Sequence, residues 1–190
     1  MIAKWAILKR QQIADYKLFS LHKKQVRSPR TGEIREMLAL QFPDWVLVLA
    51  LTPQQEVVMV RQYRHGTEQV SLELPGGLVD PDDTTPELSA QRELLEETGF
   101  KVSNIRLIGE CYPQPAILSN RCFFYLAEDA VQAQEQNLDA GEDIDILTVP
   151  LKDIRAKIVN KEIDHGMVLQ AFFFLSLHRG PGTDLLKAPV

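Results

Sequence analysis

The stretch from residue 73 to residue 100 constrains this chain most, because it joins a strand, a glycine turn and a helix in a fixed order. Its sequence is ELPGGLVDPDDTTPELSAQRELLEETGF. A short apolar strand ends in the Pro-Gly-Gly turn, and an acidic loop follows. The helix is predicted to begin at Pro86, since proline is tolerated in a first helical turn, with Thr84 or Thr85 as its cap. It is predicted to stop at Gly99, since glycine adopts the left-handed conformation of a helix end.

The carboxylates of this helix are predicted to share one face. At about 100° per residue, Glu93, Glu96 and Glu97 fall within an arc of roughly 100°. Leu88 and Leu95 point to the opposite side. The helix is therefore expected to bury its leucine face and to carry its acidic cluster on the other.

Two interpretations of the acidic face are open. A face with three like charges, with Arg92 as the nearby cation, is often only a solvated surface. Alternatively, carboxylate oxygens bind a hard divalent cation such as Mg²⁺, which retains waters for a phosphate substrate. Gly76 and Gly77 favour the second interpretation, because glycines let the backbone approach a ligand closely.

These residues resemble the Nudix box, the signature of the Nudix hydrolases, written GX5EX7REUXEEXGU with U an aliphatic residue. The REUXEEXGU half is matched completely by residues 92–100. The first half begins at Gly77 and departs from the signature twice. Asp83 stands where the family has glutamate, and the spacer between Asp83 and Arg92 is one residue longer.

The composition is typical of a soluble globular protein, and the net charge limits the classes of binding partner that can be expected. A length of 190 residues suits one domain with a small extension, and 45% of the residues are hydrophobic and 25% charged. The net charge of −5 offers no basic surface, so no nucleic-acid partner is expected. A polyanionic substrate would need local cations, either metal ions or a few placed arginines.

Neither a membrane span nor a disulfide framework is predicted. No apolar run approaches the roughly 18 residues that cross a bilayer, and the first residues lack a signal-peptide pattern. A cytoplasmic location without a membrane partner is therefore expected. Cys111 and Cys122 are too few for a zinc cluster, and each is expected to be a small buried hydrophobe.

The chain divides into three expected parts. Residues 1–42 are predicted to form an N-terminal β-hairpin extension, with strands near 17–22 and 33–40. Residues 43–179 are predicted to form the main domain, and residues 180–190 a tail. Within the main domain, residues 46–51 are apolar on both faces, which predicts a central strand. A turn leads from them to a second run at 57–64, and the paired runs suggest an antiparallel hairpin.

The second half of the main domain is predicted to contain strands followed by two helices. We expect strands at 102–112, 121–127 and 144–149, and an exposed acidic loop at 128–143. Helices are expected at 150–159 and 164–178, with the phenylalanines of the second packed against a sheet. His165 and His178 lie near the two ends of that helix, and structural roles are expected for both.

Two further segments resemble the ADP-ribose pyrophosphatase branch of the family. In that branch a Gln-aromatic-Arg strand precedes a turn containing Pro-Ala-Gly, and here residues 61–64 and 72–77 take these places. The resemblance implies that Arg64 contacts the phosphate or ribose of the substrate and that Glu73 is an active-site carboxylate. A surface ion pair for Arg64 and a simply exposed Glu73 are the alternatives. Gly76 replaces the usual alanine, which we expect to matter little if its carbonyl oxygen binds metal.

The resemblance covers about residues 43–179 and implies an α/β protein with the Nudix fold. In that fold a mixed β-sheet lies between helices in an α/β/α sandwich. It also implies Mg²⁺, or alternatively Mn²⁺, bound by the carbonyl oxygen of Gly76 and by Glu93, Glu96 and Glu97.

A catalytic base is also implied. The ADP-ribose branch often carries a water-activating carboxylate just before the strand predicted at 144–149, and Glu142 stands there. The alternatives are that Asp143 is the base or that neither residue is, and Glu96 is a second catalytic candidate.

The activity implied is hydrolysis of the diphosphate linkage in a nucleoside diphosphate sugar, with ADP-ribose giving AMP and ribose 5-phosphate. A GDP-sugar, a dinucleotide or capped RNA are alternative substrates, because the box reports the diphosphate chemistry alone. A non-catalytic nucleotide-sugar-binding module is disfavoured, because all three box glutamates are present. The branch also implies a homodimer and an aromatic side chain stacked on the base. Trp5, Tyr16 and Trp45 are candidates for that role, with core packing as the alternative.

Overall fold

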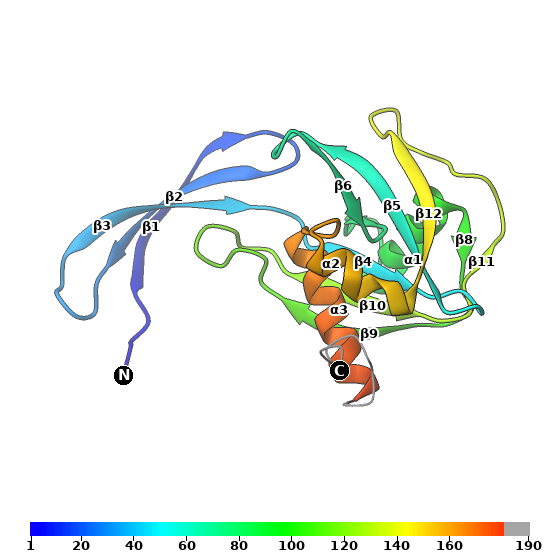
Figure 1. Ribbon diagram of the computed structural model, residues 1–190. Helices are drawn as coiled ribbons and strands as arrows, with labels where there is room; N and C mark the ends of the chain where they lie inside the picture. Colours follow the sequence, from blue (N-terminus) through cyan, green and yellow to red (C-terminus); the bar gives the residue numbers. More distant parts are fainter. Residues whose placement is uncertain (181–190) are drawn as a thin grey trace. The chain divides into compact units, whose positions relative to one another are not determined.

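The computed structural model describes residues 1–180 as two compact units (Figure 1). Unit 1 contains Met1–Asp44 together with Tyr112–Arg121, and unit 2 contains Trp45–Cys111 and the described chain from Cys122 to Gly180. Apart from Gly180, the predicted tail lies outside the described residues. Every helix of the described chain is too short or too polar to traverse a lipid bilayer.

Unit 1 is a three-stranded antiparallel sheet in the order β1-β2-β3. Its strands are β1 (Ala6–Asp15), β2 (Ser20–Arg27) and β3 (Ile34–Gln41). The sequence predicted only the last two, because residues 9–12 of β1 are all polar and do not alternate. The segment 112–121 joins β3 through hydrogen bonds from Leu40 N–H to the Ile117 carbonyl and from Ser119 N–H to the Leu40 carbonyl.

Unit 2 is built on two larger sheets and a two-stranded ribbon. The first sheet has the order β7-β4-β10-β9, in which β4 and β10 are parallel, and the second has the antiparallel order β12-β5-β6. The ribbon pairs β11 with β8. The strands are β4 (Trp45–Ala50), β5 (Glu56–Arg64), β6 (Gln69–Glu73), β7 (Gly76–Leu78), β8 (Phe100–Lys101), β9 (Ile105–Cys111), β10 (Cys122–Ala127), β11 (Val131–Gln132) and β12 (Ile144–Pro150).

The predicted hairpin between β4 and β5 is wrong. The two strands belong to different sheets, and an isolated bridge between Val57 and Leu51, the residue after β4, joins them beside the turn. Each lies between two other strands of its own sheet, and both carry buried apolar side chains on both faces. A strand that is apolar on both faces is stable only where other elements cover both faces, which is met by an inner position in a sheet. The short turn at residues 52–55 therefore carries the chain from an inner position of one sheet to an inner position of the other.

The core of unit 2 has two clusters on opposite faces of β4. Leu47 and Leu49 lie in one cluster, and Val46 and Val48 lie in the other, as the period of two in a strand requires. Helices α2 (Ile154–Val159) and α3 (Gly166–Arg179) contribute to the first, and α1 (Pro86–Thr98) to the second. Figure 1 shows α2 and α3 in front of the sheets and α1 behind them. The predicted α/β/α arrangement is confirmed.

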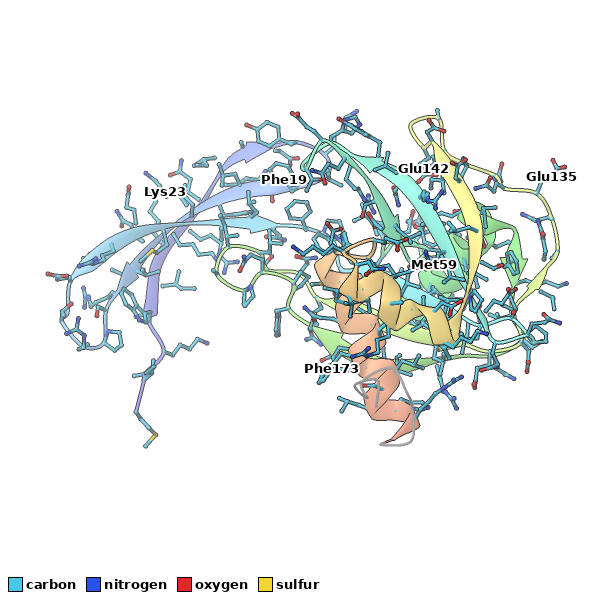
Figure 2. The ribbon with its side chains drawn as sticks, viewed as in Figure 1. Phe19, Lys23, Met59, Glu135, Glu142 and Phe173 are labelled. Atoms are coloured by element: carbon cyan, nitrogen blue, oxygen red, sulfur yellow. The ribbon has the colours of Figure 1, made fainter. Side chains whose placement is uncertain are left out.

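Two helix predictions need correction in detail. The region predicted as a helix from residue 150 begins as a 3₁₀ turn, η1 (Leu151–Asp153), before α2. The phenylalanines of α3 divide: Phe172 is buried and Phe174 packs against the core, while Phe173 is exposed on the outer side (Figure 2). A run of consecutive phenylalanines cannot share one face of a helix, because successive residues are about 100° apart.

Candidate active site

Helix α1 begins and ends as the sequence predicts. Thr85 is the N-cap in an extended conformation, and its hydroxyl accepts a hydrogen bond from the Leu88 N–H. Pro86 occupies the first turn, and Gly99 ends the helix at φ 70° while its N–H donates to the Leu95 carbonyl at 2.8 Å. These ends fix which α1 side chains face the sheets.

The predicted leucine face of α1 is wrong. Leu88 is 45% exposed, whereas Ala90, Leu94 and Glu97 are buried. Ala90, Leu94 and Glu97 recur at the three- and four-residue spacing of one helical stripe, so the core stripe of α1 includes a carboxylate. The acidic cluster is therefore partly inside the protein and is not a solvated face.

The Gly76-Gly77 turn in β7 lies against the carboxylates of α1. The Gly76 N–H donates to Glu97 Oε2 at 2.9 Å. A Cβ atom placed on Gly77 would lie 2.5 Å from Glu93 Oε1, so the Glu93 carboxylate occupies the space that any side chain at residue 77 would need. The two glycines thus hold two box glutamates close to the β7 backbone.

Burial raises the pKa of both carboxylates. The side chain of Glu93 is 12% exposed, and burial raises its pKa to about 7 although Arg92 opposes the shift. Glu97 is 3% exposed, and burial raises its pKa to about 8 although the Gly76 hydrogen bond opposes the shift. The charges of Glu93 and Glu142 raise the pKa of Glu97 further. The nearby arginines do not offset the effect of burial on either carboxylate, and a bound divalent ion would supply the missing positive charge.

Arg92 links the two halves of the box. Its Nη1 atom lies 3.1 Å from Glu93 Oε1 and 3.0 Å from Glu96 Oε2. Its Nε and Nη2 atoms lie 3.3 Å from Asp83 Oδ2, which also accepts a hydrogen bond from the Ser89 hydroxyl at 2.8 Å. The two departures in the first half of the box therefore do not prevent a loop carboxylate from pairing with Arg92.

Arg64 and Glu73 form a two-pronged ion pair across β5 and β6. Arg64 Nε donates to Glu73 Oε1 at 2.8 Å, and Nη2 donates to Oε2 at 2.7 Å. Burial alone would raise the pKa of Glu73, but the hydrogen bonds and charge of Arg64 lower it below its ordinary value. Glu73 is 2% exposed, so the exposed-carboxylate alternative is wrong, while 44% of the Arg64 side chain remains exposed.

Glu142 lies on the loop before β12 (Figure 2). Its carboxylate accepts a hydrogen bond from the Asp139 N–H at 3.0 Å, and its own N–H donates to the Asp139 carbonyl. The charge of Glu142 raises the pKa of both Glu93 and Glu97, so the loop brings it into electrostatic range of α1. Glu142 therefore acts electrostatically on two of the three box glutamates, Glu93 and Glu97.

Within residues 1–180, no three His, Cys, Asp or Glu side chains converge as a preformed metal centre. Arg92 draws Glu93 and Glu96 into ion pairs, and Glu97 is bonded to the β7 backbone. The donor set nevertheless fits a hard cation, because it consists of carboxylates, two of them buried and with raised pKa values.

Two contacts near the site were not anticipated from the sequence. His165 Nε2 lies 3.9 Å from Glu73 Oε2, which joins the start of α3 to the Arg64–Glu73 pair. Gln136 donates from its side-chain amide to the Glu97 carbonyl oxygen, at the end of α1. Neither has a sequence signal, because both depend on chain segments that meet only in the folded unit.

Gly76→Ala is expected to destabilise the protein, contrary to the expectation that alanine would matter little there. A Cβ atom on residue 76 would lie 2.2 Å from the Val46 backbone oxygen, and the backbone of β4 can yield only by moving. The expected loss is about 1–3 kcal/mol of unfolding free energy, as for other overpacked sites. Denaturant unfolding measures it, with Gly66→Ala as the control because nothing lies within 4 Å of a Cβ there. Equal stability of the two variants would contradict the close approach of β7 to β4.

Comparison with known proteins places the chain in a family. It is 28% identical to the ADP-ribose pyrophosphatase of Bacillus subtilis (strain 168), over 88% of this chain and 90% of that protein. It is 32% identical to the GDP-mannose pyrophosphatase of Enterobacter sp. (strain 638), over 65% of this chain and 68% of that protein. A solved structure of an ADP compounds hydrolase shares the fold, with a TM-score of 0.79, 21% identity and coverage of 92% of this chain and 94% of that chain. The sequence profile of the NUDIX domain matches residues 42–172, and the chain therefore belongs to the NUDIX family.

Proposed function

We propose that this protein is a metal-dependent pyrophosphatase that cleaves the diphosphate linkage of a nucleoside diphosphate sugar. The proposal rests on the carboxylates of Glu93 and Glu97, which are only 12% and 3% exposed and are held against the Gly76-Gly77 turn. Keeping such groups in the fold costs stability, as their raised pKa values show, and a structural role does not account for that cost. A bound cation would account for it.

The residues take distinct roles in this proposal. Glu93, Glu96, Glu97 and the carbonyl oxygen of Gly76 would hold Mg²⁺, or alternatively Mn²⁺. When bound, the metal neutralises charge on the diphosphate and lowers the pKa of a coordinated water. When a metal ion binds, the ion pair between Arg92 and Glu96 would weaken, and the ion pair between Arg92 and Asp83 would remain.

Two residues outside α1 would act on water and substrate. Glu142 would take the proton of the attacking water, since it is exposed and electrostatically coupled to Glu93 and Glu97. Arg64 would contact a phosphate or the ribose with the exposed part of its guanidinium, while buried Glu73 fixes its orientation from behind. The Arg64–Glu73 pair supports substrate binding by Arg64, because the arginine enters the reaction already oriented.

ADP-ribose is the proposed substrate, giving AMP and ribose 5-phosphate. The relative from Bacillus subtilis named as an ADP-ribose pyrophosphatase matches this chain along 88% of its length. A GDP-sugar is the second candidate. The Enterobacter relative named as a GDP-mannose pyrophosphatase has a higher sequence identity, 32% against 28%, but matches a smaller share of this chain, 65% against 88%.

A substrate panel tests this proposal. ADP-ribose, ADP-glucose, GDP-mannose, NADH, coenzyme A and a dinucleoside polyphosphate are incubated with the protein and Mg²⁺, and phosphate is measured after a phosphatase step. We expect ADP-ribose to show the highest kcat/KM and EDTA to abolish turnover. If GDP-mannose is turned over faster than ADP-ribose, a GDP-sugar becomes the proposed substrate. If no compound is turned over with Mg²⁺ or Mn²⁺, the proposed activity is overturned.

We further propose that the protein forms a homodimer through unit 1. The sheet of unit 1 exposes many large apolar side chains, including Ile7, Leu8, Ile13, Ile34 and Leu38. A soluble monomer rarely leaves such a set uncovered, and a second copy would cover it. Light scattering that gives the mass of a single chain would contradict this.

A further inference from the structure

The loop that carries Glu142 is attached to the carboxyl end of α1. The last carbonyl groups of a helix have no partner within the helix. In this protein the Glu96 carbonyl accepts from the Asn137 N–H at 2.9 Å, and the Gly99 carbonyl accepts from the N–H groups of Ala133 and Gln134. The segment 133–137 therefore serves as the cap of the helix that carries the box glutamates.

Gln136 makes the contact that closes this loop. Its Nε2 atom donates to the Glu97 carbonyl at 2.5 Å and also to the Ile144 carbonyl at 3.1 Å. Glu97 lies in the last turn of α1, and Ile144 is the first residue of β12. One amide group thus joins the end of the helix to the start of the strand.

The residues between these two attachment points include Glu142. The chain leaves the helix cap at Asn137 and returns to β12 at Ile144, which pairs with Gln62 of β5. Inside the loop Glu142 is held by its mutual pairing with Asp139, which is itself exposed. The position of Glu142 relative to α1 is therefore set mainly at the two ends of the loop. Gln136 contacts both ends, because it donates to the Glu97 carbonyl of α1 and to the Ile144 carbonyl of β12.

We propose that Gln136 is a positioning residue that fixes Glu142 relative to the carboxylates of α1. This rests on the proposed function, in which Glu142 takes the proton of the attacking water. Two carbonyl oxygens converge on one nitrogen, so the site needs a group with two N–H donors, and a primary amide supplies them. Glutamine has this group, whereas glutamate at the same length would place an acceptor against two acceptors.

Steady-state kinetics on the full-length protein with Mg²⁺ and ADP-ribose test the proposal. Gln136→Ala is expected to lower kcat on the order of 10-fold to 100-fold with little change in KM, since a displaced base impairs the reaction more than binding. Gln136→Glu should be worse than Gln136→Ala, and Gln136→Lys should recover part of the loss because an ammonium group donates to both carbonyls and suits a helix carboxyl end.

Gln134→Ala is the matched control. It changes the same residue type in the same segment, and Gln134 contributes only backbone contacts to the cap. Its kcat should equal that of the unmodified protein. An unchanged kcat in Gln136→Ala, or an equal loss in both alanine variants, would overturn the proposal.

A double-mutant cycle separates positioning of Glu142 from a general effect on α1. In a Glu142→Gln background, Gln136→Ala should lower kcat by less than about 2-fold, because two changes that act through one group are not additive. A full repeat of the loss in that background would show that Gln136 acts elsewhere and would overturn the proposal.

Hydrogen exchange keeps this test distinct from the proposed activity. If the protein cleaves no compound in the panel, the proposed function fails while the attachment can still be measured. Amides of residues 137–143 should exchange faster in Gln136→Ala than in Gln134→Ala, because the loop has lost one of its attachments. Equal exchange in the two variants would show that Gln136 does not fix the loop.

Discussion

Glu97→Gln is expected to lower kcat/KM by about 10³-fold, equivalent to about 4 kcal/mol of transition-state stabilisation, while the protein stays folded. Glutamine has the shape of glutamate, and its amide oxygen can still accept the hydrogen bond from the Gly76 N–H. The change removes the negative charge that a metal ion would bind. It also removes a buried charge that the fold disfavours, as the pKa of about 8 indicates. Turnover of ADP-ribose and denaturant unfolding of the same sample measure the two effects.

Glu87→Gln provides the control for this change. Glu87 belongs to the same helix, but it is exposed in the first turn and far along the helix from Glu97. Its replacement should leave turnover within about 2-fold of that of the unmodified protein, since surface substitutions rarely alter stability or a distant site. If Glu97→Gln loses activity and folding stability together, Glu97 has a structural role and the proposed metal site loses one of its two buried ligands.

The metal-free protein is expected to lose stability as the pH rises from about 5 to about 8. Glu93 and Glu97 have folded-state pKa values of about 7 and about 8, above the ordinary value of 4.5. The folded protein therefore retains these protons while the unfolded chain has released them, so unfolding releases protons and becomes more favourable at higher pH. The stability is fully present below about pH 4.5 and is lost as the pH rises through the folded-state values. The expected loss of unfolding free energy over this pH range is on the order of a few kcal/mol, and thermal unfolding in EDTA measures it.

Magnesium should reverse this loss. A cation that binds the ionised carboxylates of the folded protein stabilises it by mass action, so added Mg²⁺ should raise Tm more at pH 8 than at pH 6. Glu97→Gln should flatten the pH profile in EDTA, and Glu87→Gln should not. The lowered pKa of Glu73 has the opposite sign, but its effect falls below about pH 4.5, outside this window. Stability in EDTA that is constant or rises between pH 5 and pH 8 would contradict the raised pKa values of Glu93 and Glu97 in the metal-free protein.

Much of the candidate site could be predicted from local sequence. The threonine cap, the proline start and the glycine end of α1 depend on residues within the helix and its flanks. The structure confirms all three and selects Thr85 over Thr84 as the cap. The spacing of Glu93, Glu96 and Glu97 follows from helix geometry alone. The REUXEEXGU match likewise predicted the family, which the profile over residues 42–172 confirms.

Other features required contacts between distant parts of the chain. The prediction that Leu88 faces the core failed, because helical spacing gives the relative directions of side chains but not which direction is covered. The pairing of β4 with β10 could not be inferred, since an apolar run on both faces fits a hairpin and a central parallel strand equally. The burial of Glu73 depends on Arg64, which lies on the neighbouring strand.

The sequence by itself therefore determined the carboxylate helix, its ends and the glycine turn before it, because these are set by propensities and spacing over a few residues. Only the tertiary structure decided that Glu97 is buried against Gly76, that Asp83 pairs with Arg92 across the altered loop, and that Gln136 joins α1 to β12. The reason is physical: burial and long-range hydrogen bonds arise when segments far apart in the chain pack together, and no local pattern encodes which segments will meet.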